Sequence, residues 1–166
     1  YSEAVKYLHQ AVELNKWSQK SRFEFGKVLG ASGDIPAAID ELQIAIAIKP
    51  AAEIYNELGG NHRRVGNLDT AVDNYLKGLA LGPEDPELWN SLGVVYVEQG
   101  RFEAACEVFK NLLADWPNRI DYRMNFIVAL ASIGDQPEAL NQCRTILKVA
   151  PDNVKARALM EIVGRN

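Results

Sequence analysis

The chain has 166 residues, of which 48% are hydrophobic and 24% charged, a composition typical of globular proteins and unlike that of disordered chains. A formal net charge of −4 gives no overall basic field to attract nucleic acid, and no apolar run is long enough to span a membrane. The two cysteines form no CxxC motif and no zinc-type spacing with histidine, so neither a metal nor a cofactor is expected.

Apolar residues recur three and four positions apart along most of the chain, which is the spacing of amphipathic helices. In chain order this pattern predicts one helix near 2–15, four helix pairs, and a terminal helix near 154–163. The expected pairs are 20–32 with 36–49, 53–65 with 69–82, 87–99 with 103–116, and 121–133 with 137–150. The predicted fold class is therefore all-α.

A repeat of about 34 residues organises these helices. It is marked by Pro50, Pro83, Pro117 and Pro151 and, in phase with them, by Gly33, Gly66, Gly100 and Gly134. Glycine just past a helix end adopts the left-handed conformation, and proline cannot continue a helix. Each unit is therefore predicted to be a helix, a tight turn, a second helix and a stop.

One position of the second helix is alanine in every copy. The column consists of Ala4, Ala38, Ala71, Ala105 and Ala139. A small residue conserved within the chain at one helical position indicates that a neighbouring helix crosses closely there. Stacked units of this kind bury their apolar faces against one another and form an α-solenoid.

These residues resemble the tetratricopeptide repeat family, whose pattern is matched best by residues 86–119. The matching positions there are Trp89, Leu92, Gly93, Tyr96, Gly100, Ala105, Phe109 and Pro117. The resemblance implies one right-handed superhelical array over 1–166, with full repeats at 19–51, 52–85, 86–119 and 120–153. Residues 1–18 would be the second helix of a partial repeat and 154–166 a terminal helix. The copy at 120–153 departs most, with Ile127 and Cys143 where glycine and an aromatic are usual.

The resemblance also implies that the first helices line a concave groove. The groove positions are Phe23, Lys27, Asn56, Arg63, Asn90, Val94, Val97, Met124 and Val128. The N-terminal half of this set carries cations, and the C-terminal half is an apolar strip that is expected to be exposed because other columns already supply the core. Asn56 and Asn90 stand at equivalent places, where an amide can donate and accept hydrogen bonds with an extended peptide backbone.

The leading functional expectation is a protein–protein interaction scaffold that is not an enzyme. Its partner would be a peptide or helix with apolar anchors and an acidic element. The alternatives are a substrate-recruiting region of a larger enzyme and a fixed structural subunit of an assembly. A chaperone-tail clamp is disfavoured because Glu87 stands where a cation is needed.

The remaining candidate residues have structural explanations. His62 is expected to pack with one nitrogen satisfied, His9 to face solvent, and Cys106 and Cys143 to be buried. The terminal helix is expected either to cap the array or to be covered by further chain or a partner, and it is the surface for any self-association. The chain has no initiator methionine and no signal peptide, so a fragment or processed form is expected, with the cytoplasm as the default compartment.

Overall fold

The computed structural model describes residues 2–165, and within that range every regular element is an α-helix. The helices are α1 (Ser2–Leu14), α2 (Gln19–Ser32), α3 (Ile35–Ile48), α4 (Ala52–Arg64), α5 (Leu68–Leu81), α6 (Pro86–Glu98), α7 (Phe102–Asp115), α8 (Ile120–Ser132), α9 (Gln136–Val149) and α10 (Val154–Arg165). The all-α prediction is confirmed. Predicted and observed bounds agree within one residue, except that α10 continues to Arg165.

The turn inside each repeat is closed by glycine, as predicted. Gly100 has φ +73°, and its N–H donates to the carbonyl of Val97 at 3.0 Å, while the N–H of Arg101 donates to Tyr96 at 2.8 Å. This pair of bonds is the Schellman motif, which satisfies the last carbonyls of a helix. The same two bonds recur at the other three turns, and each of those glycines also has positive φ.

The second helices end just before the prolines. Trp116, for example, has φ −123° and ψ 66°, and Pro117 follows it. The residue before a proline is pushed out of the helical region because the proline ring clashes with it. The prediction that proline stops each second helix is confirmed at this and the three equivalent positions.

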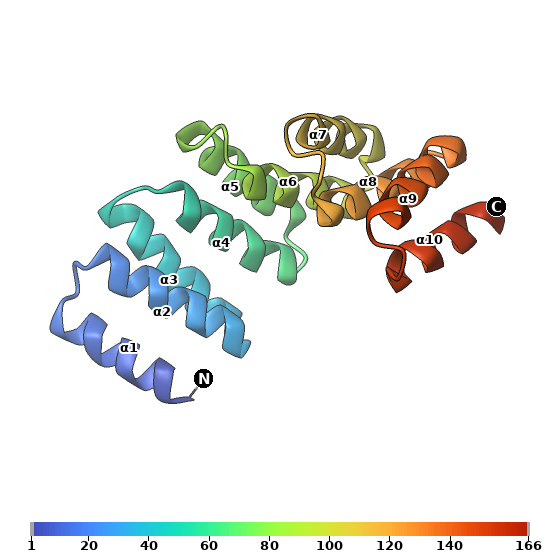
Figure 1. The fold of residues 1–166 in the computed structure, drawn as a ribbon. Coiled ribbons are helices and arrows are strands. Elements are labelled where there is room, and N and C mark those ends of the chain that lie inside the picture. The colour runs from blue at the N-terminus through green and yellow to red at the C-terminus, as the bar shows by residue number, and fades with distance from the viewer. Residues whose placement is uncertain (1, 166) are drawn as a thin grey trace. The chain divides into compact units, whose positions relative to one another are not determined.

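The chain divides into two compact units, Tyr1–Leu88 and Trp89–Asn166. In the N-terminal unit, each of the helices α1 to α4 packs on the next helix in chain order (Figure 1). Its core contains Phe25, Leu29, Leu42 and Leu58. In the C-terminal unit, α7 packs on α8, α8 on α9 and α9 on α10. The assignment of all 166 residues to one array stays a prediction.

An arginine in the first turn of three first helices holds the loop that precedes it. Arg22 donates to the carbonyl of Lys16, Arg123 to that of Pro117, and Arg157 to that of Pro151, at 2.8, 2.6 and 2.6 Å. These side chains satisfy carbonyl groups that lie outside any helix. Arg22 also pairs with Glu41 of α3 at 2.6 Å, so it links the loop to both helices of its repeat.

The alanine column is buried wherever two neighbouring helices enclose it. Ala38, Ala71, Ala105 and Ala139 have no exposed surface, whereas Ala4 is exposed. The difference arises because α1 packs on α2 alone among the helices of the N-terminal unit.

We expect Ala105→Leu to destabilise the protein by about 1–3 kcal/mol, because added methylene groups cannot be accommodated in a filled core. Urea denaturation followed by circular dichroism measures this change. Ala114→Leu, at an exposed position of the same helix, is the control and should change stability by less than about 0.5 kcal/mol. Equal effects of the two substitutions would contradict the assigned packing.

Candidate functional site

The nine predicted groove residues all lie on first helices. The N-terminal unit carries Phe23, Lys27, Asn56 and Arg63 on α2 and α4, and the C-terminal unit carries Asn90, Val94, Val97, Met124 and Val128 on α6 and α8. Eight of the nine are half-buried, and Val128 is 39% exposed. The two sets belong to different units and are described separately.

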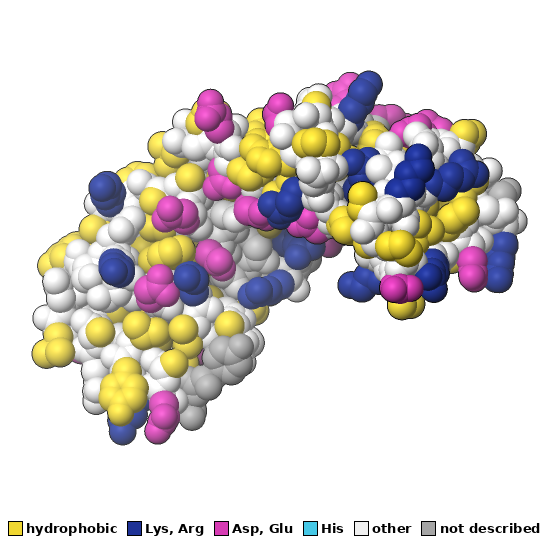
Figure 2. All heavy atoms as spheres, in the orientation of Figure 1, with side chains coloured by type: hydrophobic (Ala, Val, Ile, Leu, Met, Phe, Trp, Pro, Cys, Tyr) yellow, Lys and Arg dark blue, Asp and Glu magenta, His cyan; other side chains and the backbone are white. Residues whose placement is uncertain are grey.

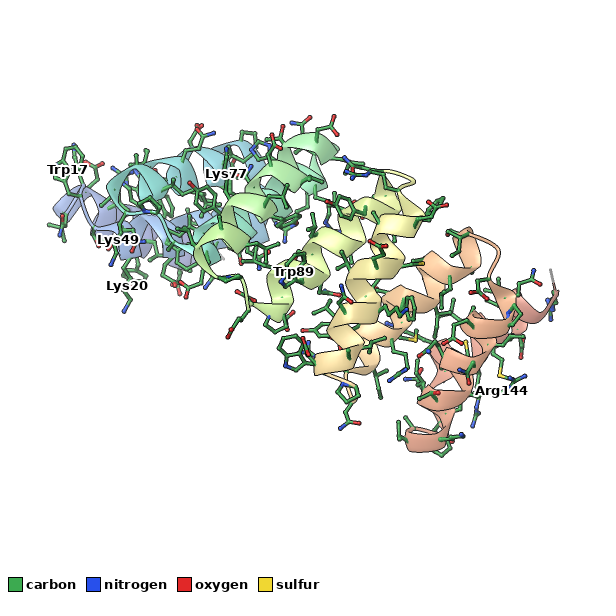
Figure 3. All side chains as sticks on the ribbon, turned by 90° about the horizontal axis from the view of Figure 1, so that it is seen from above. Trp17, Lys20, Lys49, Lys77, Trp89 and Arg144 are labelled. Carbon is green, nitrogen blue, oxygen red and sulfur yellow. The ribbon has the colours of Figure 1, made fainter. Side chains whose placement is uncertain are left out.

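In the N-terminal unit one of the two predicted cations, Lys27, is paired with a carboxylate of its own helix. Lys27 Nζ lies 3.3 Å from the carboxylate of Glu24 and 5.1 Å from the centre of the Phe23 ring. Phe23 in turn packs against the core, so it is not a free apolar anchor. Lys20, one turn earlier, extends away from the ribbon (Figure 3). Glu24 therefore offsets the positive charge of Lys27 on this face.

A partly buried polar link joins the two first helices of this unit, and the sequence analysis missed it. Arg64 Nη1 of α4 donates to the carbonyl of Gly30 in α2 and to Asn61 Oδ1, both at 3.2 Å. Asn61 is 1% exposed and its Nδ2 donates to the carbonyl of Glu57. The sequence does indicate that Asn61 is unusual, because the equivalent position in the later repeats is apolar. The residues there are Val95, Ala129 and Val163.

In the C-terminal unit a groove runs between α8 and α10. Its volume is about 580 Å³, and we call it the α8–α10 groove. Its apolar lining consists of Ile120, Met124, Val128 and Leu159. Two of these, Met124 and Val128, are predicted groove residues, so the structure brings them together with a residue of the terminal helix. Apolar and positively charged side chains gather on the same C-terminal helices (Figure 2).

The expectation that the apolar strip is exposed holds for only part of it. Val94, Val97 and Met124 are half-buried and pack against the core of the C-terminal unit, whereas Val128 is exposed. Side chains on this face are partly exposed and also pack against the core, so one residue can contribute to both packing and surface. Substitutions at the first three positions will therefore affect folding as well as binding.

The groove carries two charged side chains with different surroundings. Asp121 is held by Arg119, whose Nε and Nη2 donate to its two carboxylate oxygens at 2.9 and 2.6 Å. The hydrogen bonds from Arg119 lower the pKa of Asp121. Lys155, at the start of α10, forms no ion pair with any residue in the described range. Its positive charge is therefore available at the groove.

Three asparagines supply polar groups on this face. Asn125 Nδ2 donates to Asn90 Oδ1 at 2.9 Å, which links α8 to α6. Asn153 Oδ1 accepts from the N–H of Ala156 at 2.9 Å and so begins α10. Asn125 and Asn153 both line the α8–α10 groove. The other polar atom of each amide has no protein partner within residues 2–165. These atoms are Asn90 Nδ2, Asn125 Oδ1 and Asn153 Nδ2.

The histidines and cysteines have mostly the structural surroundings expected of them. His9 is exposed and its ring meets that of Phe25 edge-on at 6.0 Å. His62 is half-buried, burial lowers its pKa, and its Nδ1 has no partner among the described residues. Cys143 is fully buried. Cys106 is half-buried beside a second cavity of about 590 Å³ between α7, α8 and α9.

Neither cysteine is activated. Burial raises the pKa of both thiols, which keeps them protonated and unreactive at neutral pH. Among the described residues there is no cluster of histidine, cysteine, aspartate or glutamate that could hold a metal ion. In the same range, none of the helices combines the length and apolar character that crossing a membrane requires.

Two segments of the chain match known protein families. Residues 62–100 match a family described as "TPR repeat", and residues 96–162 match one described as "Tetratricopeptide repeat". The two matches together span more than half of the sequence. The chain belongs to the tetratricopeptide repeat family.

Several tetratricopeptide repeat structures share its fold. It superposes on YrrB, described as a TPR protein with an unusual peptide-binding site, with a TM-score of 0.79 and 23% identity, covering 96% of this chain and 83% of that one. The TM-score is 0.81 for a tetratricopeptide repeat protein of Parabacteroides merdae, also at 23% identity, covering 88% and 59%.

Curated relatives are much longer proteins. The chain is 28% identical to the general transcriptional corepressor ssn6 of Schizosaccharomyces pombe over 70% of its length, which is 11% of that protein. It is 24% identical to BBSome complex member BBS4 of Bos taurus over 88% of its length, or 28% of BBS4. The chain thus spans less than a third of either relative. Family membership and these relatives indicate a protein–protein interaction scaffold.

Proposed function

We propose that this tetratricopeptide repeat protein binds a linear segment of a partner protein in the α8–α10 groove. The observation that carries the proposal is the groove itself, which combines apolar lining at Met124 and Val128 with the ammonium of Lys155, a group that has no ion pair within residues 2–165. Binding sites for protein segments commonly combine an apolar centre with a few polar groups that orient the ligand. The proposed role requires no catalytic residue.

Val128 is the best position at which to test this proposal. It is 39% exposed at the groove, so a substitution there disturbs the core less than one at Met124 or Val97. Ligands would be selected from a random peptide library with the wild-type chain, and their affinities measured by fluorescence anisotropy. We expect Val128→Asp to weaken binding by at least about tenfold, because a charge would be buried against apolar ligand atoms.

The matched control is Val149→Asp, which makes the same change at a valine that is 73% exposed on α9. It should leave the affinity unchanged, and circular dichroism should show that both variants are folded. Unchanged affinity in Val128→Asp would place the binding site elsewhere and overturn the proposal.

A second candidate role is that of a fixed subunit in an assembly. Two relatives are named as members of complexes, the BBSome and the anaphase-promoting complex. The N-terminal unit also exposes large apolar side chains near its first helix: Tyr7 is 66%, Leu14 88% and Trp17 81% exposed. Trp17 projects away from the helices (Figure 3). If this surface holds the protein in a complex, Val128→Asp should leave the complex intact. Leu14→Asp should prevent the protein from joining it.

A further inference from the structure

One apolar position recurs on three successive first helices of the C-terminal unit. It is occupied by Val94 in α6, Val128 in α8 and Ile162 in α10, at intervals of one repeat. Val94 is half-buried, Val128 is 39% exposed and Ile162 is 59% exposed. The hydrogen bond between Asn90 and Asn125 joins α6 to α8, and α8 contacts α10 directly. By helical register the three residues occupy the same place on successive first helices, and we call them the ladder, with one rung for each helix. Of the three, Val128 lines the α8–α10 groove.

The spacing of this ladder limits the conformation of a bound segment. Axes of packed helices lie about 8–10 Å apart. Because α6 is bonded to α8 and α8 contacts α10, we expect the rungs to recur at about that distance. A polyproline II chain returns to the same face every third residue, after about 9.3 Å. An α-helix does so every seventh residue, after about 10.5 Å. A β-strand fits poorly, because its same-face positions recur at about 6.7 and 13 Å.

The asparagines distinguish the two conformations that fit. An α-helix satisfies its own backbone groups, whereas a polyproline II chain has no internal hydrogen bonds and needs partners for them. Beside the ladder, the amide of Asn90 retains its N–H groups, Asn125 its acceptor oxygen and Asn153 its N–H groups. This face thus offers donors and an acceptor to a backbone that lacks internal bonds. The polar lining favours the polyproline II conformation.

The charges orient the segment along the ladder. Asp121 is paired with Arg119 through two hydrogen bonds, and Arg165 lies 3.8 Å from Glu161. Lys155 is the remaining charge of the groove, and it belongs to α10, the helix that carries the Ile162 rung. An acidic residue of the partner is therefore favoured at the α10 end.

We infer that the α8–α10 groove and its ladder bind an internal, polyproline II segment with an apolar residue at every third position and an acidic side chain over α10. This inference rests on the proposed function and adds the conformation, spacing and charge of the ligand. An amphipathic helix with a seven-residue period and a free C-terminal carboxylate are the competing ligands.

The spacing is tested with synthetic peptides of equal composition and blocked ends, added to the full chain. Their apolar residues recur at every second, third or seventh position, and the glutamate is placed at either end so that both chain directions are tried. We expect the better of the two third-position peptides to bind at least about tenfold more tightly than any other. Tighter binding of a seventh-position peptide, or equal binding of all, would overturn the inference.

The pairing of Lys155 with an acidic residue of the ligand is tested by reversing the charge on each partner in turn. Lys155→Glu should weaken binding of the third-position peptide severalfold at low salt, and replacing the peptide glutamate with lysine should restore it. Lys148→Glu, at an exposed lysine of α9, is the control and should have no effect. If Lys155→Glu changes nothing, or if only a peptide with a free C-terminal carboxylate responds, the acidic side chain is ruled out.

The experiments distinguish a wrong ligand from a wrong binding site. If library-selected peptides depend on Val128 while no third-position peptide binds, the groove is a binding site and the inferred ligand is wrong. If the selected peptides also ignore Val128→Asp, both are wrong.

Discussion

Replacing Gly93 with isoleucine is expected to destabilise the C-terminal unit by about 3 kcal/mol or more. A Cβ atom at Gly93 would lie 2.7 Å from Cζ and 2.8 Å from Cε1 of Phe109, and 3.1 Å from Cγ1 of Val108. Phe109 is fully buried, so its ring cannot move away without displacing other core side chains. Overpacking a filled core in this way typically costs 1–3 kcal/mol for smaller additions. The free energy of unfolding in urea, followed by circular dichroism, measures the effect.

The chain itself contains the exchange that should rescue this variant. In the next repeat the equivalent pair is Ile127 and Cys143, both fully buried, so a larger residue on the first helix faces a smaller one on the second. Phe109→Cys alone should cost about 3–4 kcal/mol through the cavity it leaves. Combined with Gly93→Ile, it should cost at least about 2 kcal/mol less than the sum of the two single changes.

This exchange explains why residues 120–153 depart from the repeat pattern. The two departures, at Ile127 and Cys143, compensate one another in volume and do not weaken the packing of that repeat. Strict additivity of the two substitutions at Gly93 and Phe109 would show that the pair is not coupled and would contradict this explanation.

Two adjacent glycines of α4 should respond in opposite directions to the same substitution. A Cβ at Gly59 would lie 2.6 Å from Cε1 of Tyr75, whose side chain is 2% exposed, whereas a Cβ at Gly60 would meet only the Tyr75 hydroxyl at 3.9 Å. We expect Gly59→Ala to destabilise the N-terminal unit by about 2–3 kcal/mol through overpacking. Gly60→Ala should stabilise it by up to about 1 kcal/mol, because alanine favours the helix over glycine.

Each of these variants is the control for the other, since both make one change in one helix turn. Thermal and urea unfolding of the two proteins should move to opposite sides of the wild type. A common direction of change would mean that helix propensity, or a general tolerance of α4, outweighs the contact with Tyr75.

The helices and turns of this protein could be predicted because local chemistry decides them. Gly100 ends α6 through its own left-handed conformation, and Pro117 limits α7 through its own ring, and neither effect needs a distant residue. The alanine column is nearly as local, because one period of the sequence brings each copy into the same place. Its exception, Ala4, depends on which helices enclose it.

The groove residues could be predicted only in part. Their positions on first helices follow from helical offset, but the burial of Val94 and Val97 depends on how far each side chain enters the space between neighbouring helices. One repeat after Val128, the equivalent position is Ile162 of α10. That step was not taken in the sequence analysis because α10 was treated as a terminal helix and not as part of the groove.

The sequence by itself determined the all-α repeat, the helix bounds and the family, because periodic apolar positions and turn residues act within one repeat. Only the tertiary structure showed that Asn125 is bonded to Asn90 across two helices, and that Lys155 lines the groove without an ion pair to any described residue. Both features depend on which side chains of different helices come together, and this is set when the helices pack. The charge and hydrogen-bonding groups that the α8–α10 groove offers a partner are therefore properties of the packed repeats.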